Sequence, residues 1–452
     1  MKAKKSLPQP PPPKPAPTQA VPTPPAHPKL ADCAALIGLD WADEKHAVAV
    51  RVQGRTPTEH ARFDQTPEAI AAWVAELRQR FGQGKIAIGL EQARGALIYA
   101  LSRYENLVLY PINPQSLAKF RAALYPSGKK DDPVDADLLL SLLAHHGETF
   151  QPWRPDTLTT RQLGLLVEAR RAFVDVRTGH INHLQAVLKS YFPQALALVG
   201  EKLGSRLATD FLEKWATLDA VQNVKASTLR AFYYGHQCRS EDCIQERLDR
   251  IKNAVPLTTD AAILAAQSLA AQSLARLLAG LRPVIERYDE DIARLFAAHP
   301  DAAIFARLDG AGPALAPRLL VAFGTDRSRF ADADAMPCYS GTAPVTEQSG
   351  NQKWVHRRWA RPVFVHQTFV EFAGQSVRFS PWAKCCYEDL IKHGQGHWAA
   401  LRVLAVKWQR ILWRCWQNRT PYDAAIYIQS LQKRGHKIYA DLVVETAKPH
   451  GE

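Results

Sequence analysis

The sequence predicts an α/β domain, followed by a long helical segment and a mainly helical C-terminal domain. Between about residues 31 and 150, short apolar runs alternate with segments of helical periodicity, which is typical of strands and helices packed in layers. From 158 to 300 the strand pattern disappears, and apolar residues recur every three or four positions. At 452 residues the chain is also too long for one ordinary domain.

The first domain should contain two apolar strands. Residues 35–39 and 86–90 are almost wholly apolar and end in Gly-Leu. We expect residues 47–52 to pair with the first strand, and 107–112 to form another strand, stopped by Asn113-Pro114. The segments with helical periodicity are 67–81, 95–104, 116–124 and 135–145; in the first, Ile70, Trp73, Val74 and Leu77 share one face.

The middle segment, 151–300, should consist of long helices. Apolar residues between Leu163 and Ile181 recur at helical spacing, and 261–295 is rich in Ala and Leu. Long helices with an apolar seam need a partner to cover it. The spacing leaves two arrangements open, a fold-back within one chain or a coiled coil between two chains.

The third domain, 301–437, should be a set of helices joined by tight turns. Residues 308–316 read as helix, glycine turn and helix; such a turn either presents N–H groups to a phosphate or is an ordinary helical hairpin. A final helix at 397–419 has an aromatic stripe, which we interpret as core rather than as a stacking surface.

Composition points to a nucleic-acid partner and a cytoplasmic location. The formal net charge is +13, and a chain this basic most often binds a polyanion. The seven cysteines favour reduced thiols. No run of eighteen apolar residues is present, so we expect no membrane span. Residues 1–30 are proline-rich and predict a disordered tail rather than a signal peptide, and 438–452 form a second tail.

Four acids stand where strand ends and a helix start would bring them together. Asp40 and Glu91 each follow a predicted buried strand, and Asp132 and Asp135 lie three apart, on one helical face. Any one of them could be a solvated surface group, but clustered carboxylates repel unless a cation lies between them. Oxygen ligands that act on phosphate suit Mg²⁺ or Mn²⁺. Asp131 remains an alternative to Asp132.

A serine precedes the densest basic and aromatic patch of the chain. Ser349 is followed by Gly350, and a Ser-Gly pair is by itself usually a turn. The patch could neutralise a phosphate and stabilise charge in its transition state, and its tryptophans could stack on bases or merely pack. Its candidate nucleic-acid-binding residues are Lys353, Arg357, Arg358 and Arg361, with Trp354 and Trp359 between them.

In these motifs the chain resembles the DEDD transposases of the insertion-sequence one-ten family, which are bridge-RNA-guided recombinases, and the related Piv-type invertases. The resemblance covers roughly residues 33–420, within the usual uncertainty of such boundaries. One departure is that many members follow the Ser-Gly with a Lys-x-Gly segment, where this chain has 358–362. The matching segments are 37–40 with 45–46, 89–91, 113–114, 130–136, 310–313, 341–344 and 349–350.

The resemblance implies a RuvC-like, ribonuclease-H-type catalytic domain, a coiled-coil dimerisation segment and a C-terminal transposase domain. It implies that Asp40, Glu91, Asp132 and Asp135 form a metal-binding site, and that Ser349 attacks DNA and forms a transient phosphoserine link. It further implies that donor and target DNA are the substrates and that a guide RNA encoded by the element takes part. The protein would be a homo-oligomer, a dimer or tetramer, in which the acidic site and the serine meet across protomers.

Two other functions compete with recombination. In a junction-resolving nuclease with a RuvC-like domain, water would be the nucleophile and Ser349 would be structural. A protein that only binds nucleic acid would gain nothing from an acidic cluster facing phosphate, so the acids argue against it. A covalent link between protein and DNA separates the recombinase from the nuclease.

Overall fold

The computed structural model describes residues 29–91, 94–125 and 132–435. Nearly all of the predicted tail at 1–30, and all of the one at 438–452, lie outside the described residues. The chain divides into two compact units, Met1–Pro155 and Asp156–Glu452, which are described separately below.

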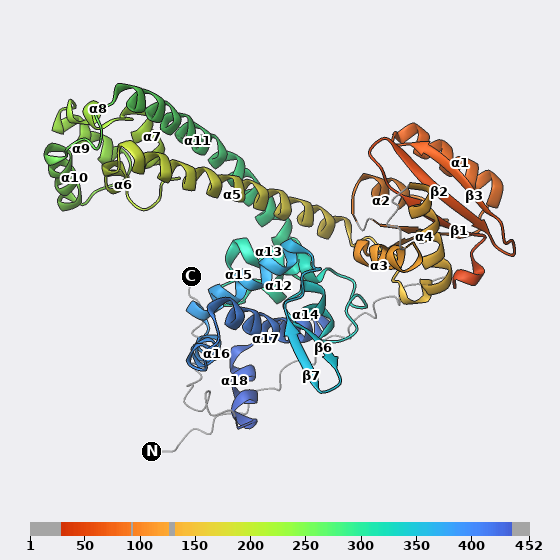
Figure 1. The fold of residues 1–452 in the computed structure, drawn as a ribbon. Coiled ribbons are helices and arrows are strands. Elements are labelled where there is room, and N and C mark those ends of the chain that lie inside the picture. Colours follow the sequence, from red (N-terminus) through yellow and green to blue (C-terminus); the bar gives the residue numbers. More distant parts are fainter. Residues whose placement is uncertain (1–28, 92–93, 126–131, 436–452) are drawn as a thin grey trace, which may run out of the picture. The chain divides into compact units, whose positions relative to one another are not determined.

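The first unit is built on a mixed five-stranded sheet with the strand order β3-β2-β1-β4-β5. β1 pairs antiparallel with β2 and parallel with β4; β2 pairs antiparallel with β3, and β4 parallel with β5. In the described part of this unit, the sheet is accompanied by four helices, which Figure 1 labels, and by two short 3-10 turns. The elements are η1 (Leu30–Asp32), β1 (Ala35–Asp40), β2 (Lys45–Val52), β3 (Thr58–Asp64), α1 (Pro67–Phe81), β4 (Ile86–Leu90), α2 (Ala96–Leu101), β5 (Leu107–Pro111), α3 (Pro114–Leu124), α4 (Asp132–His146) and η2 (Gly147–Thr149).

Most elements expected in this unit are confirmed, and one strand was not predicted. The face of α1 is buried as expected, and Thr66 caps the helix by accepting a hydrogen bond from the Ala69 N–H. The helix expected at 95–104 is shorter and ends at Leu101. β3 was not expected because most of its side chains are polar and exposed, so it lacks the alternation that marks a half-buried strand.

The two faces of the sheet pack against different helices. On one face, Ile37, Leu39 and Ile88 form a core with apolar residues of α1 and α2. On the other, Leu36 and Ala87 pack with residues of α4, among them Ala136 and Leu140. Successive side chains of a strand point to opposite faces. Asp40, two and four residues after Gly38 and Leu36, therefore points to the face that α4 covers.

The first part of the second unit contains two long helices, which pack against each other in antiparallel directions. α5 (Leu158–Tyr191) and α11 (Ala261–Ala297) run antiparallel along much of their length (Figure 1). Arg170 Nε lies 2.5 Å from Asp289 Oδ1, and the rings of Phe173 and Tyr288 are 5.5 Å apart. The structure thus shows the fold-back arrangement. The far ends of both helices pack on a helical tip made of α6 (Gln194–Val199), α7 (Arg206–Lys214), α8 (Leu218–Gln222), α9 (Ala226–Gly235) and α10 (Glu241–Asn253).

α11 has the length and composition of a membrane span, with a mean hydropathy of 1.3 over its most apolar window. It is the one such helix in the described part of the chain, and helices in the core of water-soluble proteins meet the same criterion. Acids and arginines of α11 pair with its neighbours: Arg276 Nε lies 2.9 Å from Glu213 Oε1. We therefore assign it no membrane role.

The rest of the second unit is a helical domain with an aromatic core and one exposed β-hairpin. Trp382, Trp408, Trp416, Phe323 and Phe369 are fully buried, so the stripe at 397–419 is largely core as predicted, although Trp398 is 64% exposed. The elements are α12 (Ala302–Ala306), α13 (Gly312–Phe323), α14 (Ala335–Ser340), β6 (Val345–Ser349), β7 (Gln352–His356), α15 (Val363–Phe379), α16 (Pro381–Lys392), α17 (His397–Asn418) and α18 (Ala424–Lys433).

The glycine turn at 308–316 has a packing role. A Cβ on Gly310 would lie 3.1 Å from the backbone of Gln375 and from the Phe379 ring, both in α15. Gly310 also has a φ of +84°, which favours glycine. These contacts support the helical hairpin rather than a phosphate-binding turn.

Candidate active site

Three of the predicted acids line one pocket at the carboxyl end of the parallel strands. Asp40 ends β1, and Glu91 directly follows β4, the parallel neighbour in which Leu90 pairs with Leu39. Asp135 lies in the first turns of α4 and is buried. Together with residues of α3, these acids line a pocket of about 420 Å³, whose other lining residues are Trp41, Pro114, Gln115, Ala118 and Arg121.

Two strand glycines let α4 approach the sheet closely enough to bring Asp135 there. A Cβ on Gly38 would lie 2.0 Å from the carbonyl oxygen of Ala136, and one on Gly89 would lie 3.2 Å from that of Leu139. Gly38 and Gly89 are register partners in β1 and β4. Any larger residue at Gly38 would push α4, and Asp135 with it, away from the strand ends.

A buried histidine fixes the turn after Asp40. The Ala42 N–H donates to His46 Nδ1 at 3.2 Å, so this nitrogen is an acceptor and His46 is neutral, with its proton on Nε2. Nε2 then donates to Gln65 Oε1 in a short hydrogen bond. Burial lowers the pKa of His46, in keeping with the neutral form. His46 therefore ties the β1–β2 turn beside Asp40 to the end of β3.

Arg121 of α3 is a pocket residue that the sequence did not reveal. Its Nε lies 2.7 Å and its Nη2 2.5 Å from Asp135 Oδ1. Arg121 thus supplies the positive charge that the buried carboxylate faces in this structure. The contact joins residues fourteen apart through the packing of α3 on α4, so no local pattern in the sequence could have predicted it.

The remaining acid is described only in part. Asp132 is the first residue of α4, but its side chain lies outside the described residues, as does all of Asp131. The choice between them stays a prediction. Asp137, two residues after Asp135 on α4, lies outside this pocket, and its Oδ1 is 2.9 Å from Nε2 of His60 on β3.

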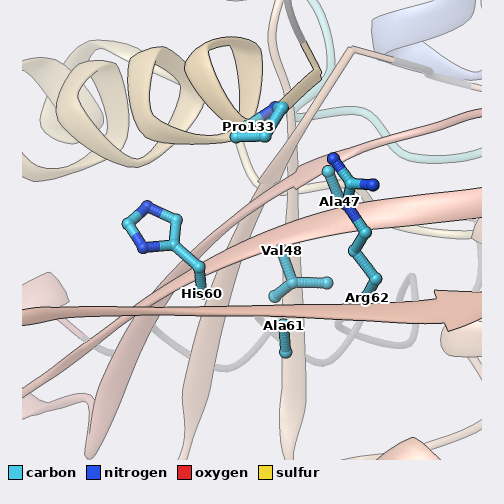
Figure 2. A pocket seen from close by; sticks show the side chains of 6 residues that line it. All are labelled: Ala47, Val48, His60, Ala61, Arg62 and Pro133. Atoms are coloured by element: carbon cyan, nitrogen blue, oxygen red, sulfur yellow. The ribbon is translucent and has the colours of Figure 1, made fainter.

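A second hollow of about 260 Å³ lies between β2, β3 and the start of α4. Figure 2 shows His60 and Arg62 rising from β3 toward Pro133, while Ala61 between them points the other way. The hollow is lined also by Ala47 and Val48. It places an arginine near the helix start that carries Asp132.

Ser349 lies at the tip of the exposed hairpin in the second unit. It is the last residue of β6 and pairs with Gln352 across a two-residue turn, in which Gly350 has a φ of +57°. Glycine at the first turn position with positive φ suits a type II′ hairpin turn. Both strands are exposed along nearly their whole length, so the Ser349 hydroxyl is open to a large partner.

The base of the hairpin is anchored by a buried hydrogen-bond network. Ser340 Oγ donates to Gln409 Oε1 at 2.9 Å, and Gln409 Nε2 donates to Thr342 Oγ1 at 2.9 Å. Gln409 belongs to α17, and all three side chains are buried. Residues 340–342, which precede the hairpin that carries Ser349, are therefore fixed to α17.

The predicted basic residues take different positions around the hairpin. Lys353 pairs with Gln348, on the face opposite Ser349, whereas Trp354 pairs with Glu347 on the face of Ser349. The guanidinium groups of Arg357 and Arg361 lie 4.8 and 5.8 Å from the ring centre of Trp359, which is 71% exposed. Arg358 is half-buried.

Comparison with known proteins gives the family. A model of the DEDD transposases of IS110, described as transposase, matches residues 37–193, and a model of the transposase IS116/IS110/IS902 family matches residues 302–388. Together they cover more than half of the chain, and each contains one of the two candidate sites. The chain belongs to the IS110 family of transposases.

Curated relatives match over nearly the whole chain. The "mini-circle putative transposase for IS117" of Streptomyces coelicolor is 27% identical over 414 residues, 85% of this chain and 94% of that protein. A 42 kDa protein of insertion element IS900 from Mycobacterium paratuberculosis is 27% identical over 76% of this chain and 85% of its own length. A 43.6 kDa protein of insertion element IS110 from S. coelicolor is 23% identical, over 87% and 96%.

The donor set of the acidic pocket fits a hard divalent cation in this IS110-family transposase. Asp40, Glu91 and Asp135 offer only carboxylate oxygens, the ligands that Mg²⁺ and Mn²⁺ prefer. Among the side chains that the structure describes, no three such groups are close enough to hold an ion as they stand. Asp135 is held by Arg121 instead, so ion binding would require this pair to rearrange.

Arg121→Gln should lower stability without metal and enlarge the stabilisation by Mg²⁺. It leaves the buried Asp135 carboxylate without its partner, which costs about 3 kcal/mol when a buried pair is broken. A divalent ion then restores the missing charge. The measurement is the shift in melting temperature between EDTA and Mg²⁺.

Arg80→Gln is the matched control, because Arg80 pairs with Glu59 at 2.6 Å on the surface of the same unit. Surface pairs are worth at most about 1 kcal/mol, so this variant should leave both melting temperatures nearly unchanged. An Arg121→Gln protein whose response to Mg²⁺ equals that of the wild type would show that Arg121 does not compete with a cation.

Proposed function

We propose that this transposase cuts and rejoins DNA through a covalent phosphoserine intermediate on Ser349, with a metal-binding acidic site that has the RuvC-like, ribonuclease-H-type arrangement. The observation that carries the acidic site is the single pocket lined by Asp40, Glu91 and Asp135, from two parallel strands and a helix that packs on them. The sheet order β3-β2-β1-β4-β5, half antiparallel and half parallel, supports the RuvC-like fold.

The acids and the serine would have separate roles. Asp40, Glu91, Asp135 and, by its position in the sequence, Asp132 would hold Mg²⁺ or Mn²⁺, which when bound supplies positive charge to the phosphate oxygens and activates the nucleophile. Ser349 Oγ would attack phosphorus and lose its proton, and the leaving strand end would take up a proton as a hydroxyl. The new phosphate ester conserves the bond energy for rejoining.

The exposed hairpin supports a large polyanionic partner for Ser349. An isolated two-stranded hairpin is marginally stable in water, and this one has Trp354 and Val355 49% and 60% exposed. A nucleic-acid strand would cover these side chains while Lys353, Arg357, Arg358 and Arg361 neutralise its phosphates.

We also propose that a guide RNA encoded by the element selects donor and target DNA, as the family resemblance implies. A net charge of +13 suits binding through phosphates, which carries little sequence information by itself. Sequence choice is then left to base pairing.

One trapping experiment tests both the covalent phosphoserine intermediate and the guide RNA. Labelled donor DNA is incubated with protein and Mg²⁺, with or without RNA transcribed from the DNA that flanks the reading frame, and run on a denaturing gel. We expect a protein-linked DNA species at one site only with the RNA. Cutting without any linked species would favour the alternative, a junction-resolving nuclease that uses water.

We further propose a homo-oligomer, a dimer or tetramer, whose active sites form between protomers. Ile263, Leu269, Leu277 and Val284 of α11 remain 38–64% exposed although α5 covers the other side of the helix. Apolar side chains spaced near seven residues suit a second helix pair.

Mixing Asp40→Ala and Ser349→Ala chains should therefore restore adduct formation. In a random dimer mixture, half of the dimers are mixed and one of their two sites is intact, so about a quarter of the wild-type adduct should return. Each variant alone should form none. As a control, Asp40→Ala mixed with the double variant should also form none. No recovery in co-assembled mixtures would place both groups in one chain.

A further inference from the structure

We propose that Arg402, on α17, completes with Arg357 and Arg361 a preformed site for one phosphodiester group of a nucleic-acid strand beside the Ser349 hairpin. This inference deepens the proposed function, because it names the residues that would hold the strand next to the serine. Arg402 is distant from the basic patch in the sequence and only the fold brings it there.

Arg361 is held rigidly and keeps hydrogen-bond donors unused. Its aliphatic stem lies against Gly341, where a Cβ would be 2.3 Å from Arg361 Cδ. Its Nη1 donates to the carbonyl oxygen of Arg358 at 2.5 Å, while the buried Nε of each of these arginines has no partner. A guanidinium fixed by packing loses little side-chain entropy when it binds an anion.

The arginines of this cluster have no acidic partners. Within the described residues no carboxylate pairs with Arg357, Arg358, Arg361 or Arg402. Elsewhere in the same domain, arginines are paired: Arg318 with Glu371, Arg327 with Asp301, and Arg410 with Asp334, each at 2.6 Å. Positively charged groups that lie close together repel each other, and a bound anion removes this repulsion.

Arg402 interacts electrostatically with Arg357 and Arg361, in keeping with its place on α17. Burial first, and then Arg357 and Arg402, lower the pKa of the Arg361 guanidinium, and burial and Arg357 lower that of Arg402. Burial and the same arginines lower the pKa of His366 to about 4. His366 is therefore neutral and donates from Nδ1 to the Ser340 carbonyl oxygen at 3.0 Å, so it adds no charge.

α17 connects this cluster to the base of the hairpin. Its Gln409 holds Ser340 and Thr342 on either side of Gly341, the residue against which Arg361 lies. Arg402 is seven residues earlier in the same helix, about two turns, and so lies on the same side. The hairpin base and Arg402 are thus positioned by one rigid element.

The test is the salt dependence of nucleic-acid binding, measured in EDTA so that no chemistry occurs. Labelled single-stranded DNA, duplex DNA and RNA of one sequence are titrated with protein at several salt concentrations. Arg402→Gln should weaken binding about tenfold in at least one arm and lower the slope of log K against log salt by about one contact, roughly 0.9 for duplex and 0.7 for single strands. The arm that responds identifies the strand.

Arg414→Gln is the matched control. Arg414 is exposed on α17, and its loss removes the same charge about 18 Å farther along the helix. It should change the slope much less, and Arg402→Lys should retain most of it. Equal effects of Arg402→Gln and Arg414→Gln in every arm would overturn the site, since only general charge would then matter.

A second pair of variants tests the positioning of Arg361. Gly341→Ala should reproduce the loss seen in Arg361→Gln, because its Cβ would displace the arginine stem. Gly394→Ala carries similar backbone strain, with φ of +82° against +69°, but a Cβ there meets nothing within 4 Å. No difference between the two glycine variants would also count against the site. None of these outcomes depends on whether Ser349 forms an adduct.

Discussion

Ser349→Ala should abolish the covalent protein–DNA adduct and strand exchange while leaving nucleic-acid binding intact. Loss of an attacking hydroxyl removes the bond-forming atom, and such losses commonly cost about 10³-fold or more in rate. Ser349 is exposed at the hairpin tip, so the substitution should leave the melting temperature within about 1 °C of wild type, as for most surface changes. Adduct is measured on a denaturing gel and binding by anisotropy.

Thr346→Ala is a matched control on the same strand. Thr346 is an exposed hydroxyl residue of β6 but lies on the opposite face of the hairpin from Ser349. It should retain near wild-type adduct. Ser349→Cys should retain a trace at most. If Ser349→Ala still cuts DNA at the wild-type rate, water is the nucleophile and the nuclease alternative holds.

Ser349 has no group beside it in the described hairpin that would activate its hydroxyl. Among the described residues, none forms a hydrogen bond to its hydroxyl, and Glu347 on the same face is 3.4 Å from His356. A serine hydroxyl is a weak nucleophile at neutral pH and needs a base or metal. The hairpin presents the nucleophile, and activation must come from another group, for which the acidic pocket is our proposal.

Buried elements were predictable from the sequence because burial imposes a pattern. β1 and β4 are apolar runs covered on both faces, and α1 has one buried face at helical spacing. Exposed elements carry no such pattern. β3 and the β6–β7 hairpin were therefore not predicted, although Gly350 before a polar residue is a known turn signal that could have indicated the hairpin.

The positions of Asp40, Glu91 and Asp135 in one pocket follow from strand ends and helix packing, which the sequence suggested. Arg121 and Arg402 could not be found in that way, because tertiary packing brings Arg121 to Asp135 and makes Arg402 interact electrostatically with Arg357. The role of Gly38 and Gly89 was likewise hidden: the motif shows the glycines, but only the structure shows α4 against them.

The spacing of apolar residues in the sequence also could not predict how the two long helices, α5 and α11, pack. Seams on α5 and α11 could have been covered by each other or by another chain. The helical tip between them, α6 to α10, reverses the chain direction and so decides for the fold-back. Some apolar residues of α11 remain exposed, and these are the residues that we propose a second protomer covers.

Asp40→Asn should abolish adduct formation while the protein stays folded. Asp40 ends β1 on the face covered by α4, in register with the strand that precedes Glu91, so its carboxylate and those of Glu91 and Asp135 share one pocket. Asparagine has nearly the same shape but lacks the charge that a divalent cation requires. We expect at least about a 10³-fold loss, the size seen when a catalytic electrostatic group is removed.

The stabilisation of the protein by Mg²⁺ should also decrease in Asp40→Asn. The substitution removes one of the carboxylates that would hold the ion, so the rise in melting temperature on adding Mg²⁺ should shrink. Asp64→Asn is the matched control: Asp64 also ends a strand of this sheet, but it is exposed, pairs with Lys45 at 3.8 Å, and lies outside the pocket. It should keep wild-type adduct and the full response to Mg²⁺. Full activity in Asp40→Asn would remove Asp40 from the metal site, and an unchanged Mg²⁺ response together with lost adduct would instead give Asp40 a role in binding the DNA strand.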